Sequence, residues 1–134
     1  MSDVADSPRQ WRSTLGQAFR AALAGLAYAV ATQRNFRIHL VAAAIVCGLG
    51  IWLRIDSADW AILALAIGLV WTAEMFNTAI ETAVDLASPE YHRLAKIAKD
   101  CSAGGVLTAA VTAVIVGLIV LGPPLWIRLL GTSG

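Results

Sequence analysis

Charged residues are scarce in this sequence of 134 residues, where they make up 14% of the chain and hydrophobic residues make up 58%. An ordinary soluble domain has about 25% charged residues, so the composition excludes that class of protein. The net charge of +1 at pH 7 points to no particular partner, and we expect no nucleic-acid partner. The length, without repeats or a Pro/Gly/Ser-rich linker, favours a single domain over residues 1–134.

Several common motifs are also absent. The two cysteines, Cys47 and Cys101, form neither a CxxC pair nor a metal-binding spacing, and we interpret them as packing residues in a reduced compartment. Arginines within residues 9–20 interrupt any apolar segment there, so we expect no signal peptide. Neither a Walker A motif nor the Gly-rich loop of protein kinases is present, so a bound nucleotide would be held mainly by a metal, lysines and other side chains.

Long apolar stretches dominate the rest of the sequence, and they predict an all-α membrane protein. A membrane-spanning helix needs about 20 apolar residues, and we place three such helices at residues 36–55, 60–87 and 103–121. The pair Pro123 and Pro124 is expected to end the third helix. Tryptophans that would form aromatic belts at the membrane surfaces lie near the segment ends: Trp52, Trp60 and Trp126.

The N-terminal region has a different pattern. Residues 1–7 are polar and are expected to be disordered, and Ser7 followed by Pro8 is typical of a helix start. In residues 8–32, apolar side chains recur at helical spacing, while arginines fall on other faces. This pattern predicts an amphipathic helix lying in the membrane interface with its arginines near lipid phosphates, in preference to a helix packed on a soluble core.

The distribution of Lys and Arg predicts the orientation of the spans. Eight of these ten residues lie before the first span or between the second and third, and only Arg54 and Arg128 lie in the other two segments. Cytoplasmic segments carry the excess of positive charge. We therefore expect the N-terminus and the loop after the second span in the cytoplasm, and the C-terminus outside.

The second span carries a line of polar residues, here named the polar stripe: Glu74, Asn77, Glu81 and Asp85. Their separations from Glu74 of 3, 7 and 11 residues place all four on one helix face. A carboxylate placed centrally in a membrane costs about 2.5 kcal/mol or more, so the stripe predicts a functional site. If Trp60 marks the outer interface, a rise of 1.5 Å per residue places Glu74 about 21 Å inward and Asp85 at the cytoplasmic side.

The loop after the stripe supplies complementary charges. Within eleven residues it contains Glu90, Tyr91, His92, Lys96, Lys99 and Asp100. Phosphoryl transfer requires carboxylates for Mg²⁺, cations for phosphates and a base for the attacking hydroxyl, and all three are present. Lys96 and Asp100 are four residues apart and share a helix face. A simpler interpretation, in which Glu81 and Asp85 only pair with lysines at the membrane surface, stays open at this point.

Two segments carry a resemblance to a known family. The first is EMFNTAIETAVD at residues 74–85, and the second is AKD at residues 98–100, followed by small residues. Together they resemble the prokaryotic diacylglycerol kinase family, which includes the undecaprenol kinases, over about residues 18–121. The resemblance implies a homotrimer of three-span subunits in the bacterial inner membrane, which phosphorylates a lipid alcohol with ATP and Mg²⁺ at active sites shared between subunits.

The resemblance also implies a role for each site residue. Glu74 would be the general base that takes the proton from the lipid hydroxyl, and Asn77 would position groups beside it. Glu81 would hold Mg²⁺ at the ATP phosphates. The nucleotide site would contain Asp85, Glu90, Tyr91, His92, Lys99, Asp100 and Arg12.

The sequence departs from the family at Gln33, where the family usually has a glutamate that is the second carboxylate on the metals. Gln33 can supply a neutral oxygen but no charge, so we expect weaker metal binding or the loss of a second metal. The run NFRIH at residues 35–39 and the terminal proline pair are more similar to the undecaprenol kinases than to the diacylglycerol kinases.

Two other functions stay open. A small proton- or cation-coupled transporter would also carry carboxylates inside the membrane. Residues 60–73 are apolar apart from Thr72, however, so the stripe would open only to the cytoplasm, which favours the kinase. The second alternative is an inactive family member in which Gln33 marks the loss of catalysis.

Overall fold

The computed structural model describes residues 14–131, and these residues form four helices joined by short connections. Three of the helices, α2, α3 and α4, are long and apolar enough to cross a membrane, which confirms the predicted all-α fold with three candidate spans. Residues 1–7 and the predicted helix start at Pro8 lie outside the described residues. The helices are α1 (Leu15–Thr32), α2 (Arg34–Leu53), α3 (Ser57–Ala87) and α4 (Arg93–Leu130).

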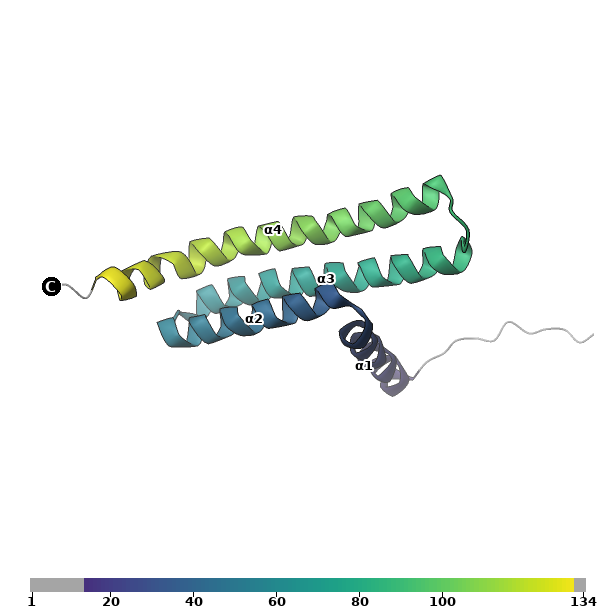
Figure 1. Ribbon diagram of the computed structural model, residues 1–134. Helices are drawn as coiled ribbons and strands as arrows, with labels where there is room; N and C mark the ends of the chain where they lie inside the picture. Colours follow the sequence, from purple (N-terminus) through teal and green to yellow (C-terminus); the bar gives the residue numbers. More distant parts are fainter. Residues whose placement is uncertain (1–13, 132–134) are drawn as a thin grey trace, which may run out of the picture.

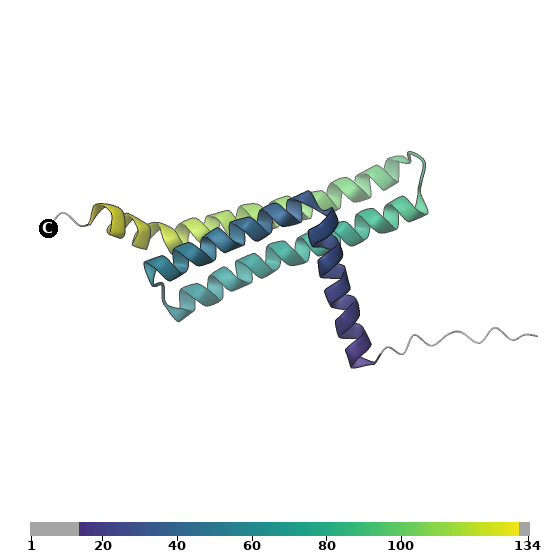
Figure 2. The ribbon, with the colours of Figure 1, turned by 60° about the horizontal axis from the view of Figure 1, so that its bottom comes forward.

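The three long helices lie side by side, while α1 leaves the bundle at a steep angle (Figures 1 and 2). α3 and α4 run antiparallel in the most extensive contact, and α2 packs against both. Both α3 and α4 continue beyond the α1–α2 junction toward the loop that connects them. At 1.5 Å per residue α3 is roughly 46 Å long, which exceeds a hydrocarbon core of about 30 Å. Part of the α3–α4 pair therefore extends past the hydrocarbon.

α1 begins with a capping box. Thr14 Oγ1 accepts a hydrogen bond from the Gln17 backbone N–H at 3.3 Å, and Gln17 Oε1 accepts one from the Thr14 N–H at 2.9 Å, so two donors at the helix start are satisfied. The described helix starts at Leu15, and residues 8–13 of the predicted amphipathic helix lie outside the described residues. Apolar side chains of α1 such as Phe19 are exposed on the single chain, as suits a helix that lies against lipid.

A single residue, Gln33, separates α1 from α2. Its backbone is extended, with φ −95° and ψ 112°, and this interrupts the helical conformation between the two helices. The Gln33 Nε2 donates a hydrogen bond to Thr32 Oγ1 at 3.3 Å, and the residue is half-buried. The change of direction at Gln33 lets α1 lie across the bundle axis while α2 runs along it (Figure 2).

The predicted end of the third span at the proline pair is wrong, because α4 continues through Pro123 and Pro124 to Leu130. A proline removes one helical N–H and its ring crowds the carbonyl four residues earlier, which bends a helix without having to end it. The ribbon of α4 changes direction near its yellow C-terminal end (Figures 1 and 2). Leu121 and Leu125, on either side of the pair, both pack in the buried cluster described next, and this packing holds the last turns in place.

The buried apolar cluster is small and lies at the end of the bundle where α2 meets α3. Most other large apolar side chains of the three spans are exposed on the single chain. Soluble monomers rarely expose apolar patches of more than a few hundred Å², so lipid or neighbouring chains must cover this surface. The cluster consists of Leu53, Leu63, Val120 and Leu121.

Candidate active site

The polar stripe of α3 runs from the interior of the bundle to its exposed end. Glu74 and Asn77 are buried, with 2% and 8% of their surfaces exposed. Glu81 is half-buried, and the Asp85 side chain is 67% exposed. The four residues singled out by their spacing therefore form one path from the helix interface to the region of the α3–α4 loop.

Side chains of α4 hold the stripe in place. Asn77 Nδ2 donates a hydrogen bond to Glu81 Oε1 at 3.1 Å, and Ser102 Oγ donates one to Asn77 Oδ1 at 2.6 Å. Further out, Lys99 Nζ lies 2.8 Å from Asp85 Oδ1. Because both ends of the Asn77 amide are engaged, its orientation is fixed, and with it the position of the Glu81 carboxylate. Ser102 was missed by the sequence reasoning, and only its place one helical turn after Lys99 could have indicated it.

The second lysine of this region has a different partner. Lys96 Nζ contacts Asp100 Oδ2, and the two side chains are 59% and 61% exposed. This confirms that they share a helix face, and it pairs Asp100 with Lys96 and not with a residue of the stripe among the described contacts. A pair this exposed is worth about 0.2–1 kcal/mol, so it contributes little to the fold.

The loop residues predicted to bind a nucleotide are exposed and are engaged locally. His92 Nδ1 accepts a hydrogen bond from the Leu94 backbone N–H at 3.2 Å and so caps the start of α4. The backbone carbonyl of Glu90 accepts one from Ser88 Oγ at 3.0 Å, and Tyr91 is 83% exposed. In the described part of the chain, none of these three side chains forms a hydrogen bond or ion pair with the polar stripe.

A histidine of α2 approaches the buried end of the stripe. His39 Nε2 lies 3.2 Å from Glu74 Oε1, close enough for an ion pair. The ring N–H is not aligned with that oxygen, and Glu74 Oε1 is buried without a hydrogen-bond donor among the described residues. The sequence reasoning did not select His39 as a site residue. The signal was available, because an ionisable residue inside a membrane span is by default a candidate functional residue.

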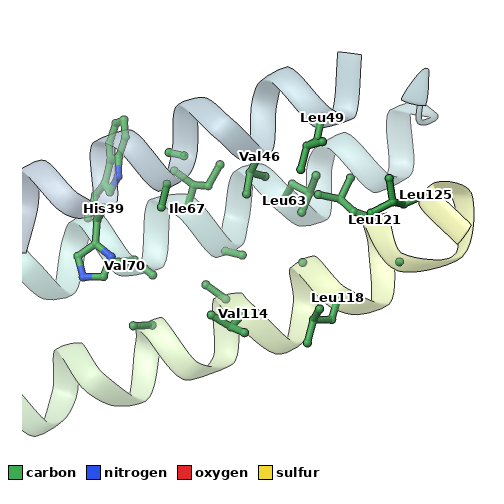
Figure 3. Close-up of a pocket in the computed structure, with 18 residues that line it drawn as sticks. His39, Val46, Leu49, Leu63, Ile67, Val70, Val114, Leu118, Leu121 and Leu125 are labelled. Atoms are coloured by element: carbon green, nitrogen blue, oxygen red, sulfur yellow. The ribbon is translucent and has the colours of Figure 1, made fainter. Parts of the chain in front are cut away.

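An apolar cavity of about 360 Å³ opens from His39 between α2, α3 and α4. Figure 3 shows His39 at one end of this cavity and Leu121 and Leu125 at the other. The remaining lining is aliphatic or aromatic, including Val46, Ile67 and Val114. His39 therefore contacts both the buried Glu74 carboxylate and the apolar cavity.

Comparison with known proteins accounts for this arrangement. The sequence matches the prokaryotic diacylglycerol kinase family over residues 20–121. This chain belongs to the prokaryotic diacylglycerol kinase family. The family consists of lipid kinases, and its matched region contains the polar stripe, the α3–α4 loop and His39.

This member of the diacylglycerol kinase family is similar to proteins named diacylglycerol kinase and to one named undecaprenol kinase. It is 53% identical over 108 residues to a diacylglycerol kinase of Synechocystis sp., with 80% of this chain and 62% of that protein covered. It is 43% identical over 94 residues to the undecaprenol kinase of Bacillus subtilis, with 70% and 76% covered. It is 36% identical over 97 residues to the diacylglycerol kinase of Escherichia coli, with 72% and 80% covered. The chain thus spans less than two thirds of the length of the Synechocystis relative.

The donor atoms of the site fit a magnesium ion that arrives with a nucleotide. In the part of the chain that the structure describes, no group of three His, Cys, Asp or Glu side chains gathers to hold a metal. Mg²⁺ is usually bound by one or two carboxylates together with substrate phosphates and waters, so a complete protein cage is not required. The half-buried Glu81 carboxylate, oriented by Asn77, would be one such ligand. Arg12, assigned to the nucleotide site from the sequence, lies outside the described residues.

Proposed function

We propose that this chain transfers the γ-phosphoryl group of ATP directly to the hydroxyl of a membrane lipid alcohol. The observation that carries the proposal is the burial of Glu74 in contact with His39, which lines one end of an apolar cavity, together with a Glu74 oxygen that no donor in the described residues satisfies. Buried acceptors are normally hydrogen-bonded, so the Glu74 carboxylate has acceptor capacity left for a further donor. A lipid hydroxyl, whose chain lies along the cavity, supplies that donor.

The transfer step then uses residues along the stripe. Glu74 accepts the hydroxyl proton as the lipid oxygen forms its bond to the γ-phosphorus, and the bond from that phosphorus to the bridging oxygen of ADP breaks. ADP leaves and the phosphorylated lipid remains in the membrane. Asn77 positions Glu81 beside the reacting phosphate through its hydrogen bond at 3.1 Å. None of these residues serves as a phosphoenzyme nucleophile.

The nucleotide is proposed to lie at the exposed end of the stripe. Lys99, now paired with Asp85, is the cation nearest the stripe and would exchange that partner for a phosphate. The other proposed nucleotide contacts are Glu90, Tyr91, His92, Asp100 and Arg12. Glu90, Tyr91, His92 and Asp100 are exposed on the single chain, which leaves them accessible to ATP.

Mg²⁺ is proposed as the cofactor, held by Glu81 with the side-chain oxygen of Gln33 as a neutral second ligand. When bound, the ion would neutralise the phosphate charge that develops during transfer. The Gln33 Nε2 is engaged by Thr32, which leaves its Oε1 as the atom available to a metal. Gln33 also favours the second candidate function, an inactive family member, because it lacks the charge of a carboxylate.

The proposed assembly is a homotrimer in a bacterial inner membrane, with the N-terminus and the α3–α4 loop in the cytoplasm. The exposed apolar surface of α2, α3 and α4 supports burial in lipid and against other copies. The excess of Lys and Arg on the N-terminal side and in the α3–α4 loop supports the orientation. Sites shared between copies would complete the sparse set of metal ligands found in one chain.

Undecaprenol is the lipid that we favour over diacylglycerol. The NFRIH run at residues 35–39 and the similarity to the undecaprenol kinase of Bacillus subtilis support it. Because other relatives are named diacylglycerol kinase, diacylglycerol must be tested beside undecaprenol as a substrate. Both lipids present a primary hydroxyl at the membrane surface and differ in the chain that the cavity would hold.

The test is the transfer of radiolabelled γ-phosphate from ATP to lipid by the purified protein in mixed micelles. Undecaprenol and diacylglycerol are compared with Mg²⁺ titrated, and Glu74→Gln is compared with Asp59→Asn, a carboxylate-to-amide change in the first turn of α3. Labelling that Glu74→Gln abolishes and Asp59→Asn preserves supports the kinase and identifies its lipid. Absence of labelling by folded wild-type protein contradicts it in favour of the inactive homologue.

A further inference from the structure

We propose that His39, at the end of the apolar cavity, is the positioning residue of the general base and holds the Glu74 carboxylate in place. The inference rests on the proposed function. It assigns to α2 the orientation of the Glu74 carboxylate, which no other residue of the polar stripe provides in the described structure. Four observations carry it: the burial of Glu74, the direction of the neighbouring hydrogen bonds, the 3.2 Å contact with His39, and the place of His39 in the cavity wall.

The Glu74 carboxylate needs a partner where it lies. It is 2% exposed, and an ionised carboxylate taken out of water costs several kcal/mol unless it is paired or hydrogen-bonded. His39 is the one basic side chain within ion-pair distance of it in the described part of the chain. Without that contact, the carboxylate would have no group to define its orientation.

The other polar groups near Glu74 are directed elsewhere. Asn77 donates to Glu81 and accepts from Ser102, so the hydrogen bonds of its amide in the described part of the chain go to residues other than Glu74. Thr78 Oγ1 donates to the backbone carbonyl of Glu74 at 2.9 Å and not to its carboxylate. The stripe thus positions Glu81 through Asn77, and leaves the base to be positioned from α2.

His39 reaches both the base and the cavity. Its side chain is 22% exposed and lies 3.2 Å from Glu74 Oε1. It also lines the end of the apolar cavity (Figure 3). A lipid hydroxyl entering that end would therefore meet His39, with the Glu74 carboxylate next to it. Catalytic hydrogen bonds are often poorly aligned before substrate binds and tighten in the complex. A small rotation of the ring would direct Nε2–H at Glu74 Oε1 and leave the other lone pairs of the carboxylate for the hydroxyl.

This role predicts a specific kinetic effect. His39→Leu keeps the apolar cavity wall but removes the donor, and a misplaced base costs about 10²-fold in kcat. Because the lipid chain would still be bound, the KM for the lipid should change by no more than about threefold. His39→Gln carries an amide N–H close to the place of Nε2, and should restore kcat to within about tenfold of wild type. His39→Asn places its amide near Nδ1 instead and should remain as impaired as His39→Leu.

The experiment measures kcat and lipid KM for these three variants, each alone and combined with Glu74→Gln. If His39 acts through Glu74, His39→Leu causes no further loss in the Glu74→Gln background. Thermal unfolding in micelles shows that each variant is folded, and a coupling between the two substitutions in the unfolding midpoint checks the contact independently of activity.

The outcomes separate this inference from the proposed function. Folded wild-type protein that labels neither lipid overturns the proposed function and the inference with it. Active wild-type protein whose kcat is unchanged by His39→Leu overturns the His39 role alone. A rise in lipid KM with an unchanged kcat also overturns it, because His39 would then be a lipid contact and not a positioning residue.

Discussion

The two ends of the polar stripe contain similar residues in opposite surroundings. At the inner end, Glu74 and Asn77 are buried between helices, and at the outer end Asp85 is exposed and paired with Lys99. Buried polar groups must be satisfied or they cost free energy, whereas exposed ion pairs contribute about 0.2–1 kcal/mol. The inner end is therefore where a polar residue is hardest to explain by stability alone.

The two ends also differ in what holds them. Of the exposed pairs at the outer end, Lys99–Asp85 joins α4 to α3 and Lys96–Asp100 lies within α4, and both can open to water and ligands at little cost. The inner contacts join α2, α3 and α4 through His39, Glu74, Asn77 and Ser102. We infer that the inner end fixes the geometry of the chemical step and the outer end exchanges partners when a nucleotide binds. The predictions below test this difference.

The largest effect is expected at the base. Glu74→Gln should lower kcat about 10³-fold, because general-base catalysis contributes about 10²–10⁴-fold. The same change should leave the thermal unfolding midpoint equal to or above that of wild type, since it removes a buried charge. Radiolabel transfer and unfolding in micelles measure the two effects, with Asp59→Asn as the control. A clear loss of stability would show that Glu74 serves the fold and would remove the main contrast between the two ends.

A second effect is expected at the middle of the stripe. Asn77→Ala removes the partner of both Ser102 and Glu81, and should lower the free energy of unfolding by about 1–3 kcal/mol. Thr82→Ala, one turn further along α3, is the matched control, because among the described residues the Thr82 hydroxyl bonds the Thr78 carbonyl of its own helix and no other helix. Denaturation in micelles compares the two variants. Equal losses would mean that the contacts between helices at Asn77 add nothing to stability.

A smaller effect is expected where the chain departs from its family. Gln33→Glu should lower the Mg²⁺ concentration for half-maximal activity by about tenfold, equivalent to about 1.4 kcal/mol, because affinity rises with the number of charged ligands. Activity measured over a Mg²⁺ titration tests this, with Gln17→Glu in α1 as a control for added negative charge. An unchanged titration curve would remove Gln33 from the metal site.

Local patterns were sufficient to predict the spans and the polar stripe. Membrane helices are defined by the length of apolar runs, and the spacing of Glu74, Asn77 and Glu81 follows from helical periodicity, so both can be predicted without tertiary contacts. Of the site geometry, only the placement of these residues on one face of α3 could be predicted. Along that face, burial decreases from Glu74 to Asp85, toward the loop that connects α3 and α4.

Contacts between helices set the limit of the sequence reasoning. The approach of His39 to Glu74 depends on how α2 packs against α3, and no spacing within either helix specifies it. The same applies to Ser102 on α4. The error at Pro123 has a related cause, because the local preference of proline to end a helix is outweighed by the packing of Leu121 and Leu125 in the bundle.

The smallest effect on stability is expected at the outer end of the stripe. Asp85→Asn breaks the exposed pair with Lys99 and should change the free energy of unfolding by less than about 1 kcal/mol. If the outer end binds the nucleotide, the KM for ATP should change severalfold while the lipid KM does not. Lys96→Ala, which breaks the exposed pair with Asp100, is the control. It should change the free energy of unfolding by a similarly small amount and leave the KM for ATP near wild type. Asp85→Asn could instead destabilise the protein as much as Asn77→Ala does. Both ends of the stripe would then stabilise the fold, and the difference in their exposure would not correspond to a difference in role.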